Sequence, residues 1–164
     1  MNNVVLLLGT NMGERISNLE NAMQEILLEL GKIIQSSAIY ETAAWGNVDQ
    51  QNFFNQVVIV SSDLSADELM KKIIRIEEKL GRVRKIKWEP RIIDIDILFF
   101  NDAILNAKNL VIPHPGLHER KFTLIPLAEI IPDYIHPVLK KSMVEILDTL
   151  KDPLEVKKIS NLIA

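Results

Sequence analysis

Residues 91–100 (RIIDIDILFF) constrain the fold more than any other stretch, because polar and apolar side chains alternate there as they do in a β-strand. Side chains two positions apart on a strand share a face and lie about 6.6 Å from each other, so Asp94 and Asp96 are predicted to lie together. The same alternation predicts Leu98 and Phe100 on that face. Two like charges on an apolar face repel each other, and we therefore expect a cation between the two carboxylates.

A basic segment leads directly into this strand. Residues 81–91 contain five lysine or arginine residues and one glutamate, a local net charge of +4 in a chain of formal net charge −3. Carboxylate oxygens suit Mg²⁺ and arginine forks suit phosphate oxygens, so the two segments together match the needs of a magnesium-bound polyphosphate. The alternatives are a solvated charge run and an edge strand whose aspartates face water.

The composition is that of an ordinary globular protein, and we predict a single domain over residues 1–164. A sequence pI of about 5.7 argues against a broad surface for nucleic acid or anionic membranes, so any polyanion must bind locally. The lack of cysteine excludes disulfides, a thiolate nucleophile and cysteine-bound zinc. The apolar run at residues 4–8 has no basic leader and is too short for a signal-peptide core, so we expect a cytoplasmic protein.

The order of patterns along the first hundred residues predicts a β-α-β-β-α-β arrangement. Apolar and β-branched runs predict strands at residues 4–8, 33–40, 53–60 and 91–100. The first helix ends at Gly31 and has an apolar stripe of Ile16, Leu19, Met23, Ile26, Leu27 and Leu30. The second helix begins at a capping box formed by Ser65 and Glu68 and ends at Gly81.

This order is typical of a ferredoxin-like α+β fold with a mostly antiparallel sheet. Both helices are predicted to cover one face of the sheet and to leave the other face free for a ligand. Beyond residue 101, prolines interrupt the chain, and short helices are predicted at about 123–130 and from Ser142 to Leu150. We expect this C-terminal extension of short helices to wrap around the sheet and complete the site.

Several short motifs carry a family resemblance. They are Gly9-Thr10-Asn11, Tyr40-Glu41-Thr42 with Trp45-Gly46, Phe53-Phe54-Asn55, Ile76-Glu77 with Gly81-Arg82-Val83-Arg84, Pro113-His114-Pro115 and Glu119-Arg120-Lys121-Phe122. The strongest motif, at residues 90–96, is similar to the pattern P-R-x-x-D-[LIV]-D. In this order and at these spacings, from Leu8 to about Asp133, the chain resembles the 6-hydroxymethyl-7,8-dihydropterin pyrophosphokinase family of folate biosynthesis.

The resemblance implies an enzyme that transfers a diphosphoryl group from ATP to the hydroxymethyl group of 6-hydroxymethyl-7,8-dihydropterin. The products would be the pterin diphosphate and AMP. It also implies two Mg²⁺ ions held by Asp94 and Asp96. The partners would be the two small-molecule substrates, with no nucleic acid and no membrane, and the protein would be a monomer.

The resemblance further assigns residues to each part of this reaction. The implied catalytic residues are Arg82, Arg91, Asp94 and Asp96. The implied ATP-binding residues are Glu77, Arg82, Arg84, Trp88, Arg91, Ile97, His114 and Arg120. The implied pterin-binding residues are Thr42, Ala44, Trp45, Gly46, Phe53, Asn55 and Phe122, with the ring between the two phenylalanines. Taken alone, these phenylalanines are equally typical of core aromatics, whereas a buried strand amide such as Asn55 needs a partner.

Two other functional classes share the predicted topology. An RNA-recognition module needs stacked aromatics on the central strands and a basic sheet, whereas this sheet is predicted to carry Asp94 and Asp96. A non-catalytic sensor domain would bind a regulator on the free face and leave both carboxylates without a role. Magnesium-dependent ATP binding would distinguish the enzyme from both.

Overall fold

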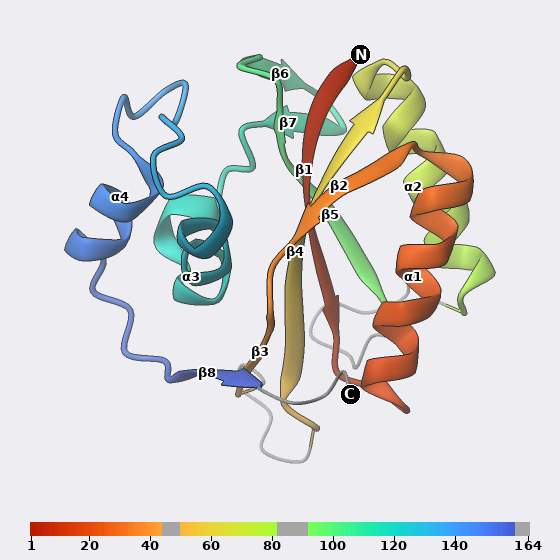
Figure 1. Cartoon of the computed structure of the whole chain (residues 1–164), viewed down its shortest axis with the longest axis horizontal. Helices are drawn as coiled ribbons and strands as arrows, with labels where there is room; N and C mark the ends of the chain where they lie inside the picture. The colour runs from red at the N-terminus through yellow and green to blue at the C-terminus, as the bar shows by residue number, and fades with distance from the viewer. Residues whose placement is uncertain (44–49, 82–91, 160–164) are drawn as a thin grey trace.

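The computed structural model describes residues 1–43, 50–81 and 92–159, and a single antiparallel sheet forms its centre (Figure 1). The sheet consists of β1 (Asn2–Thr10), β2 (Lys32–Ser36), β3 (Ile39–Thr42), β4 (Phe53–Ser62), β5 (Asp94–Phe100) and β8 (Val156–Ile159). The strand order is β5-β1-β4-β3-β8, and β2 also pairs with β4. Each of these pairs is antiparallel, which confirms the predicted α+β class.

The strand predicted at residues 33–40 is two strands, β2 and β3, because buried Ser37 interrupts it. The Ser37 hydroxyl accepts a hydrogen bond from the N–H of Val57 at 2.9 Å, and the Ser37 N–H donates to the Val57 carbonyl at 2.8 Å. A side chain that takes over a backbone partner in this way breaks the regular ladder. Strand β8, which is short and carries two lysines, was not predicted from the sequence.

Helices α1 (Arg15–Glu29) and α2 (Ala66–Lys79) cover one face of the sheet, as predicted. The capping box at the start of α2 is confirmed, since the Ser65 side chain accepts from the Glu68 N–H and the Glu68 side chain accepts from the Ser65 N–H. Gly31 ends α1 at a φ of 153°, where a Cβ would lie 2.1 Å from the Ser61 carbonyl oxygen. The position of Leu27 in the apolar stripe was wrong, because its side chain is 57% exposed.

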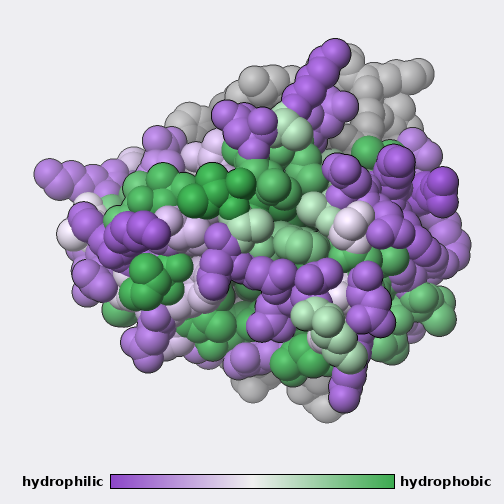
Figure 2. Space-filling model, turned by 90° about the horizontal axis from the view of Figure 1, so that it is seen from above, coloured by the Kyte–Doolittle hydropathy of each residue, from purple (hydrophilic) through white to green (hydrophobic). Residues whose placement is uncertain are grey.

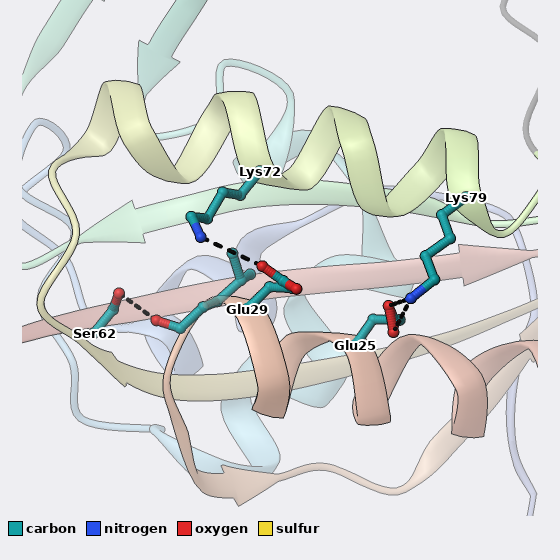
Figure 3. Close-up of polar contacts among 6 residues, drawn as sticks. Glu25, Glu29, Ser62, Lys72 and Lys79 are labelled. Carbon is teal, nitrogen blue, oxygen red and sulfur yellow. Dashed lines mark hydrogen bonds and ion pairs between the residues drawn. The ribbon is translucent and has the colours of Figure 1, made fainter.

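Polar contacts also join α1 to α2 and to the sheet (Figure 3). Lys79 of α2 forms an ion pair with Glu25 of α1, and Lys72 forms another with Glu29 at 3.3 Å. The hydrogen bond to Glu25 raises the pKa of Lys79. Near the C-terminal end of α1, the Ser62 hydroxyl of β4 donates to the carbonyl of Leu30. The two ion pairs join the helices at neighbouring turns of α1, and the Ser62 bond joins the end of α1 to the sheet.

The opposite face is not left free, which corrects the prediction: α3 (Lys121–Ile130) and α4 (Met143–Thr149) pack on it (Figure 1). The reason lies in residues 4–8, which are apolar on both faces of β1. Val4, Leu6 and Leu8 belong to the core beneath α1 and α2, whereas Val5 and Leu7 belong to a second core beneath α3 and α4. A strand with this pattern needs an apolar layer on each side.

A β-bulge changes which side chains of β5 share a face. The register with β1 shifts so that Val5 pairs with Phe99 while Leu6 pairs with Ile97, leaving Leu98 as the extra residue. Leu98 and Phe99 therefore both pack in the core beneath α3 and α4. Phe100 packs in the opposite core, so its predicted position beside the aspartates was wrong. An extra residue inverts the alternation beyond it.

A hairpin of β6 (Leu105–Ala107) and β7 (Leu110–Ile112) follows β5, and a 3₁₀ turn, η1 (Leu117–Glu119), precedes α3. Seen from above in Figure 2, apolar side chains form separate groups between hydrophilic ones on this end of the molecule. Exposed apolar residues of the hairpin include Ile104 just before β6 and Val111 in β7. Within the described ranges, no helix is both long and apolar enough to cross a lipid bilayer.

Candidate active site

One row of paired residues crosses the sheet on the face that α3 covers. Asp94 of β5 is opposite Gly9 of β1, Gly9 is opposite Asn55 of β4, and Asn55 is opposite Tyr40 of β3. Directly paired residues of a sheet project to the same face. The topology therefore brings together residues 9, 40, 55 and 94, which lie far apart in the sequence.

Gly9 makes room for the Asn55 side chain in this row. A Cβ at position 9 would lie 2.9 Å from Asn55 Nδ2, so the amide occupies the space where a side chain would be. The same Nδ2 donates to the Leu8 carbonyl at 3.2 Å, and Asn55 is only 4% exposed. The family motif contains Gly9, but no role for it was predicted, because the neighbour that requires glycine lies 46 residues away in the chain.

The two aspartates of β5 lie on one face, as predicted. Ile95 and Ile97 pack beneath α1 and α2, so Asp94 and Asp96 project to the α3 side, where both are half-buried. Because Ile97 points into the opposite core, only its main chain could contact ATP. Glu77 of α2 is 1% exposed, and its carboxylate accepts the N–H of Ile95 at 2.8 Å. A carboxyl group from the other layer thus holds the backbone between the two aspartates.

His114 is held in a defined tautomer beside these residues. Its backbone N–H donates to the Leu98 carbonyl at 3.1 Å, and its Nδ1 accepts from the Gly116 N–H at 3.1 Å. Burial lowers the pKa of His114, the charge of Arg120 lowers it further, and Asp94 opposes both effects. The ring is therefore neutral at pH 7 with its proton on Nε2, where it can donate a hydrogen bond.

Arg120 and Phe122 lie at the start of α3. Arg120 is the N-cap residue with extended backbone, and its guanidinium lies 5.7 Å from the centre of the Phe122 ring. The guanidinium also covers Gly116, where a Cβ would come within 3.1 Å of Arg120 Cζ. This contact places the cationic guanidinium of Arg120 next to the segment that contains His114, and a guanidinium in such a place can bind a phosphate group.

Thr42 and Phe53 form a cross-strand pair between β3 and β4, on the same face as Asn55. Thr42 is buried, and its Oγ1 has no hydrogen-bond partner among the described residues. Leaving a buried hydroxyl without a partner costs about 1–3 kcal/mol, which a ligand group could recover. Phe53 and Phe122 are each half-buried rather than enclosed in a core.

Seven of the predicted site residues lie outside the described ranges. They are Ala44, Trp45, Gly46, Arg82, Arg84, Trp88 and Arg91. Of the predicted site residues that the structure describes, Glu77 and Ile97 belong to the layer of α1 and α2, and the other eight form two groups on the α3 face. One group, on β5 and before α3, consists of Asp94, Asp96, His114 and Arg120; the other, on β3, β4 and α3, consists of Thr42, Phe53, Asn55 and Phe122.

Solved structures first define the class of this α+β fold. Wild-type HPPK-DHPS of Plasmodium falciparum matches with a TM-score of 0.73 at 24% sequence identity. The match covers 90% of this chain and 43% of the Plasmodium chain. The arrangement of sheet and helices is therefore that of a known α+β fold.

Sequence comparisons then identify the family. The family model described as 7,8-dihydro-6-hydroxymethylpterin-pyrophosphokinase (HPPK) matches residues 5–132. The 2-amino-4-hydroxy-6-hydroxymethyldihydropteridine pyrophosphokinase of Aquifex aeolicus is 43% identical over 147 residues, which are 88% of this chain and 90% of the relative. The enzyme of the same name from Methylorubrum extorquens is 39% identical, over 82% of this chain and 86% of the relative.

The chain therefore belongs to the 7,8-dihydro-6-hydroxymethylpterin-pyrophosphokinase family. It is an enzyme of folate biosynthesis that transfers a pyrophosphoryl group from ATP to the hydroxymethyl group of the dihydropterin. The activity expected from the resemblance is thereby confirmed, and the RNA-binding and sensor alternatives are set aside.

Proposed function

We propose that the transfer takes place on the α3 face of the sheet, with ATP on the side of β5 and the dihydropterin on the side of β3 and β4. The observation that carries this proposal is the row Asp94–Gly9–Asn55, which sets a carboxylate and a buried amide on either side of a glycine. The row joins the two groups of site residues across a single strand. The reacting oxygen and phosphorus would meet above it.

Asp94 and Asp96 would hold the two Mg²⁺ ions that the family implies. Hard carboxylate oxygens from adjacent same-face positions are suitable ligands, and both aspartates are half-buried rather than fully solvated. The hydrogen bond from Ile95 to buried Glu77 keeps the intervening backbone in place. When bound, Mg²⁺ would supply neutralisation of phosphate charge and polarisation of the phosphoryl oxygens.

On the ATP side, neutral His114 would donate a hydrogen bond from its Nε2–H to a phosphate oxygen. Arg120 would add a guanidinium, and Arg82, Arg84, Trp88 and Arg91 would contribute from residues 82–91. Fixed donors stabilise migrating negative charge without reorganising during the reaction. Glu77 would act through the β5 backbone, since its carboxylate already accepts the Ile95 N–H.

On the pterin side, Phe53 and Phe122 would stack on the two faces of the ring. Asn55 offers an amide, and Thr42 offers a hydroxyl that has no protein partner in the described part of the chain. Together with residues 44–46, these groups would read the polar edge of the ring. A site whose polar groups depend on the ligand for their hydrogen bonds rejects molecules that lack the matching groups.

The chemistry then needs positioning more than covalent assistance. A bond forms between the hydroxymethyl oxygen and the β-phosphorus, while the bond from that phosphorus to the bridging oxygen breaks and AMP leaves. The hydroxyl proton must also depart. We propose that Asp96 accepts it, through a carboxylate oxygen that does not hold a metal ion.

Substituting one residue on each side tests this division. Thr42→Val removes only the unpartnered hydroxyl, so it should raise the KM for the dihydropterin about tenfold without lowering the melting temperature. His114→Ala should raise the KM for ATP about tenfold and leave the pterin KM within about twofold. Both constants are measured by AMP release with the other substrate saturating.

Matched controls come from the same residue types. Thr149→Val, at an exposed helix end, and His118→Ala, four residues beyond His114, should change neither KM. An unchanged pterin KM in Thr42→Val would contradict the proposed pterin site. An unchanged ATP KM in His114→Ala would contradict the proposed ATP side.

A further inference from the structure

Helix α3 receives its N-terminal cap from a distant part of the chain. Its own N-cap residue, Arg120, makes no side-chain capping bond to the described residues. Instead, Oδ2 of Asp152 accepts the N–H of Lys121, the first helical residue, at 3.1 Å. Oδ1 of the same carboxylate accepts the Leu154 N–H at 3.0 Å, so two backbone groups fix its orientation.

The chain continues from Asp152 directly into β8, which extends the sheet next to β3. In this pairing, Val156 is opposite Thr42 and Lys158 is opposite Tyr40. Figure 1 shows the segment running from α4, past α3, to β8 beside β3. We name residues 152–159 the C-terminal brace. It contacts the helix that carries Phe122 at one end and the strand that carries Thr42 at the other.

The other end of α3 is already attached to β3. The Glu129 carboxylate accepts hydrogen bonds from the Tyr40 hydroxyl and from the Ala38 N–H. Thus Glu129 fixes the C-terminal end of α3, and the brace fixes the N-terminal end, where Phe122 lies. The family model matches only residues 5–132, so the brace lies beyond the matched region.

We propose that the C-terminal brace sets the separation between Phe122 and Thr42, and that Asp152 is a positioning residue for the dihydropterin. The inference rests on the proposed pterin site between Phe53 and Phe122. A carboxylate at a helix N-terminus satisfies an unpaired N–H and interacts favourably with the helix dipole. Without it the first turn, which contains Phe122, loosens, whereas Arg120 remains in contact with Gly116 outside the helix.

Substitutions at position 152 separate this role from general stability. Asp152→Ala removes the acceptor and should raise the dihydropterin KM about five- to tenfold, with kcat and the ATP KM within about twofold. Asp152→Asn keeps an oxygen that can cap the helix and should restore most of the affinity. The matched control is Asp148→Ala, an exposed aspartate on α4, which should change neither KM.

The strand end of the brace provides a second, independent variant. Lys157→Pro removes the backbone donor opposite Glu41 and should also raise the pterin KM selectively. Lys157→Ala keeps the backbone donor and should leave the constant unchanged. All variants are compared at a temperature at which circular dichroism shows them folded.

Three results would overturn the proposal. They are an unchanged pterin KM in Asp152→Ala, equal increases in both KM values, and an equal effect in Asp148→Ala. Phe122→Ala, measured in parallel, distinguishes this failure from that of the pterin site. If Phe122→Ala raises the pterin KM and Asp152→Ala does not, the brace has no positioning role; if Phe122→Ala also has no effect, the proposed pterin site is wrong.

Discussion

The two faces of the sheet differ in how their composition changes along the strands. Beneath α1 and α2, the middle of β1 is apolar and buried, through Val4, Leu6 and Leu8. On the α3 face, β1, β4 and β5 are each apolar toward one end and polar toward the other. Along β4, for example, Ile59 and Val57 pack in the core, whereas the next residue on that face is Asn55.

The change from apolar to polar falls at the same level on β1 and β4, and one pair earlier on β5. Leu7 is paired with Val57 on one side and Asp96 on the other, and two residues further on Gly9 is paired with Asn55 and Asp94. One face can therefore be devoted to stability, while the other is half core and half site. The comparison teaches that stability and catalysis can be changed separately, and four substitutions test this separation.

The largest effect is expected from Asp94→Ala at the polar end. Loss of a metal-binding carboxylate should lower kcat by about 10³-fold or more, measured as AMP release with saturating magnesium. Asp63→Ala, at an exposed turn, is the control. Near-normal AMP formation by Asp94→Ala would contradict the proposed metal site.

The opposite result is expected from Ile73→Ala in α2. Ile73 is fully buried in the apolar cluster, so its truncation should lower the free energy of unfolding by about 2–5 kcal/mol. Urea denaturation measures this change. Both KM values of the folded enzyme should stay within about twofold, and a selective change in either would show that the two faces are coupled.

A smaller effect is expected from Gly9→Ala, in the middle strand of the row. The added Cβ must displace the Asn55 amide, since it would lie 2.9 Å from Nδ2. We expect the pterin KM to rise several-fold, with little change in the ATP KM. The double variant Gly9→Ala/Asn55→Ala should be no worse than Asn55→Ala alone, because the two substitutions act on one group. Additive losses would argue against this contact.

The smallest effect is expected from His136→Asn, a substitution near the apolar end of the α3 face. Burial lowers the pKa of His136 below the ordinary 6.5, and His118 lowers it further, while its Nδ1 accepts from the N–H groups of Val138 and Leu139. Near pH 6 the unfolded chain therefore binds more protons, so stability should fall as the pH decreases below about 7. His136→Asn should reduce this slope in urea titrations at pH 7, 6 and 5. It should not abolish it, since His114 titrates in the same direction.

Local patterns were sufficient for much of the fold. The capping boxes at Ser65 and Ser142 define the starts of α2 and α4, because a cap depends only on residues within one helical turn. The alternation in residues 91–100 correctly predicts that Asp94 and Asp96 share a face, because strand geometry repeats every two residues. It fails for Phe100, since the bulge at Leu98 arises from pairing with β1 and has no signal in β5 alone.

By itself, the sequence determined which residue types could do the chemistry: two carboxylates on one face, a histidine, arginines and aromatics, all within motifs of a few residues. The tertiary structure alone decided which distant residues lie next to them. The space above Gly9 is filled by Asn55, the α3 side is half core and half site, and the start of α3 is capped by Asp152 from 31 residues away. The physical reason is range: strand period and helix capping act over a few neighbouring residues, whereas these contacts exist only after distant segments have packed together.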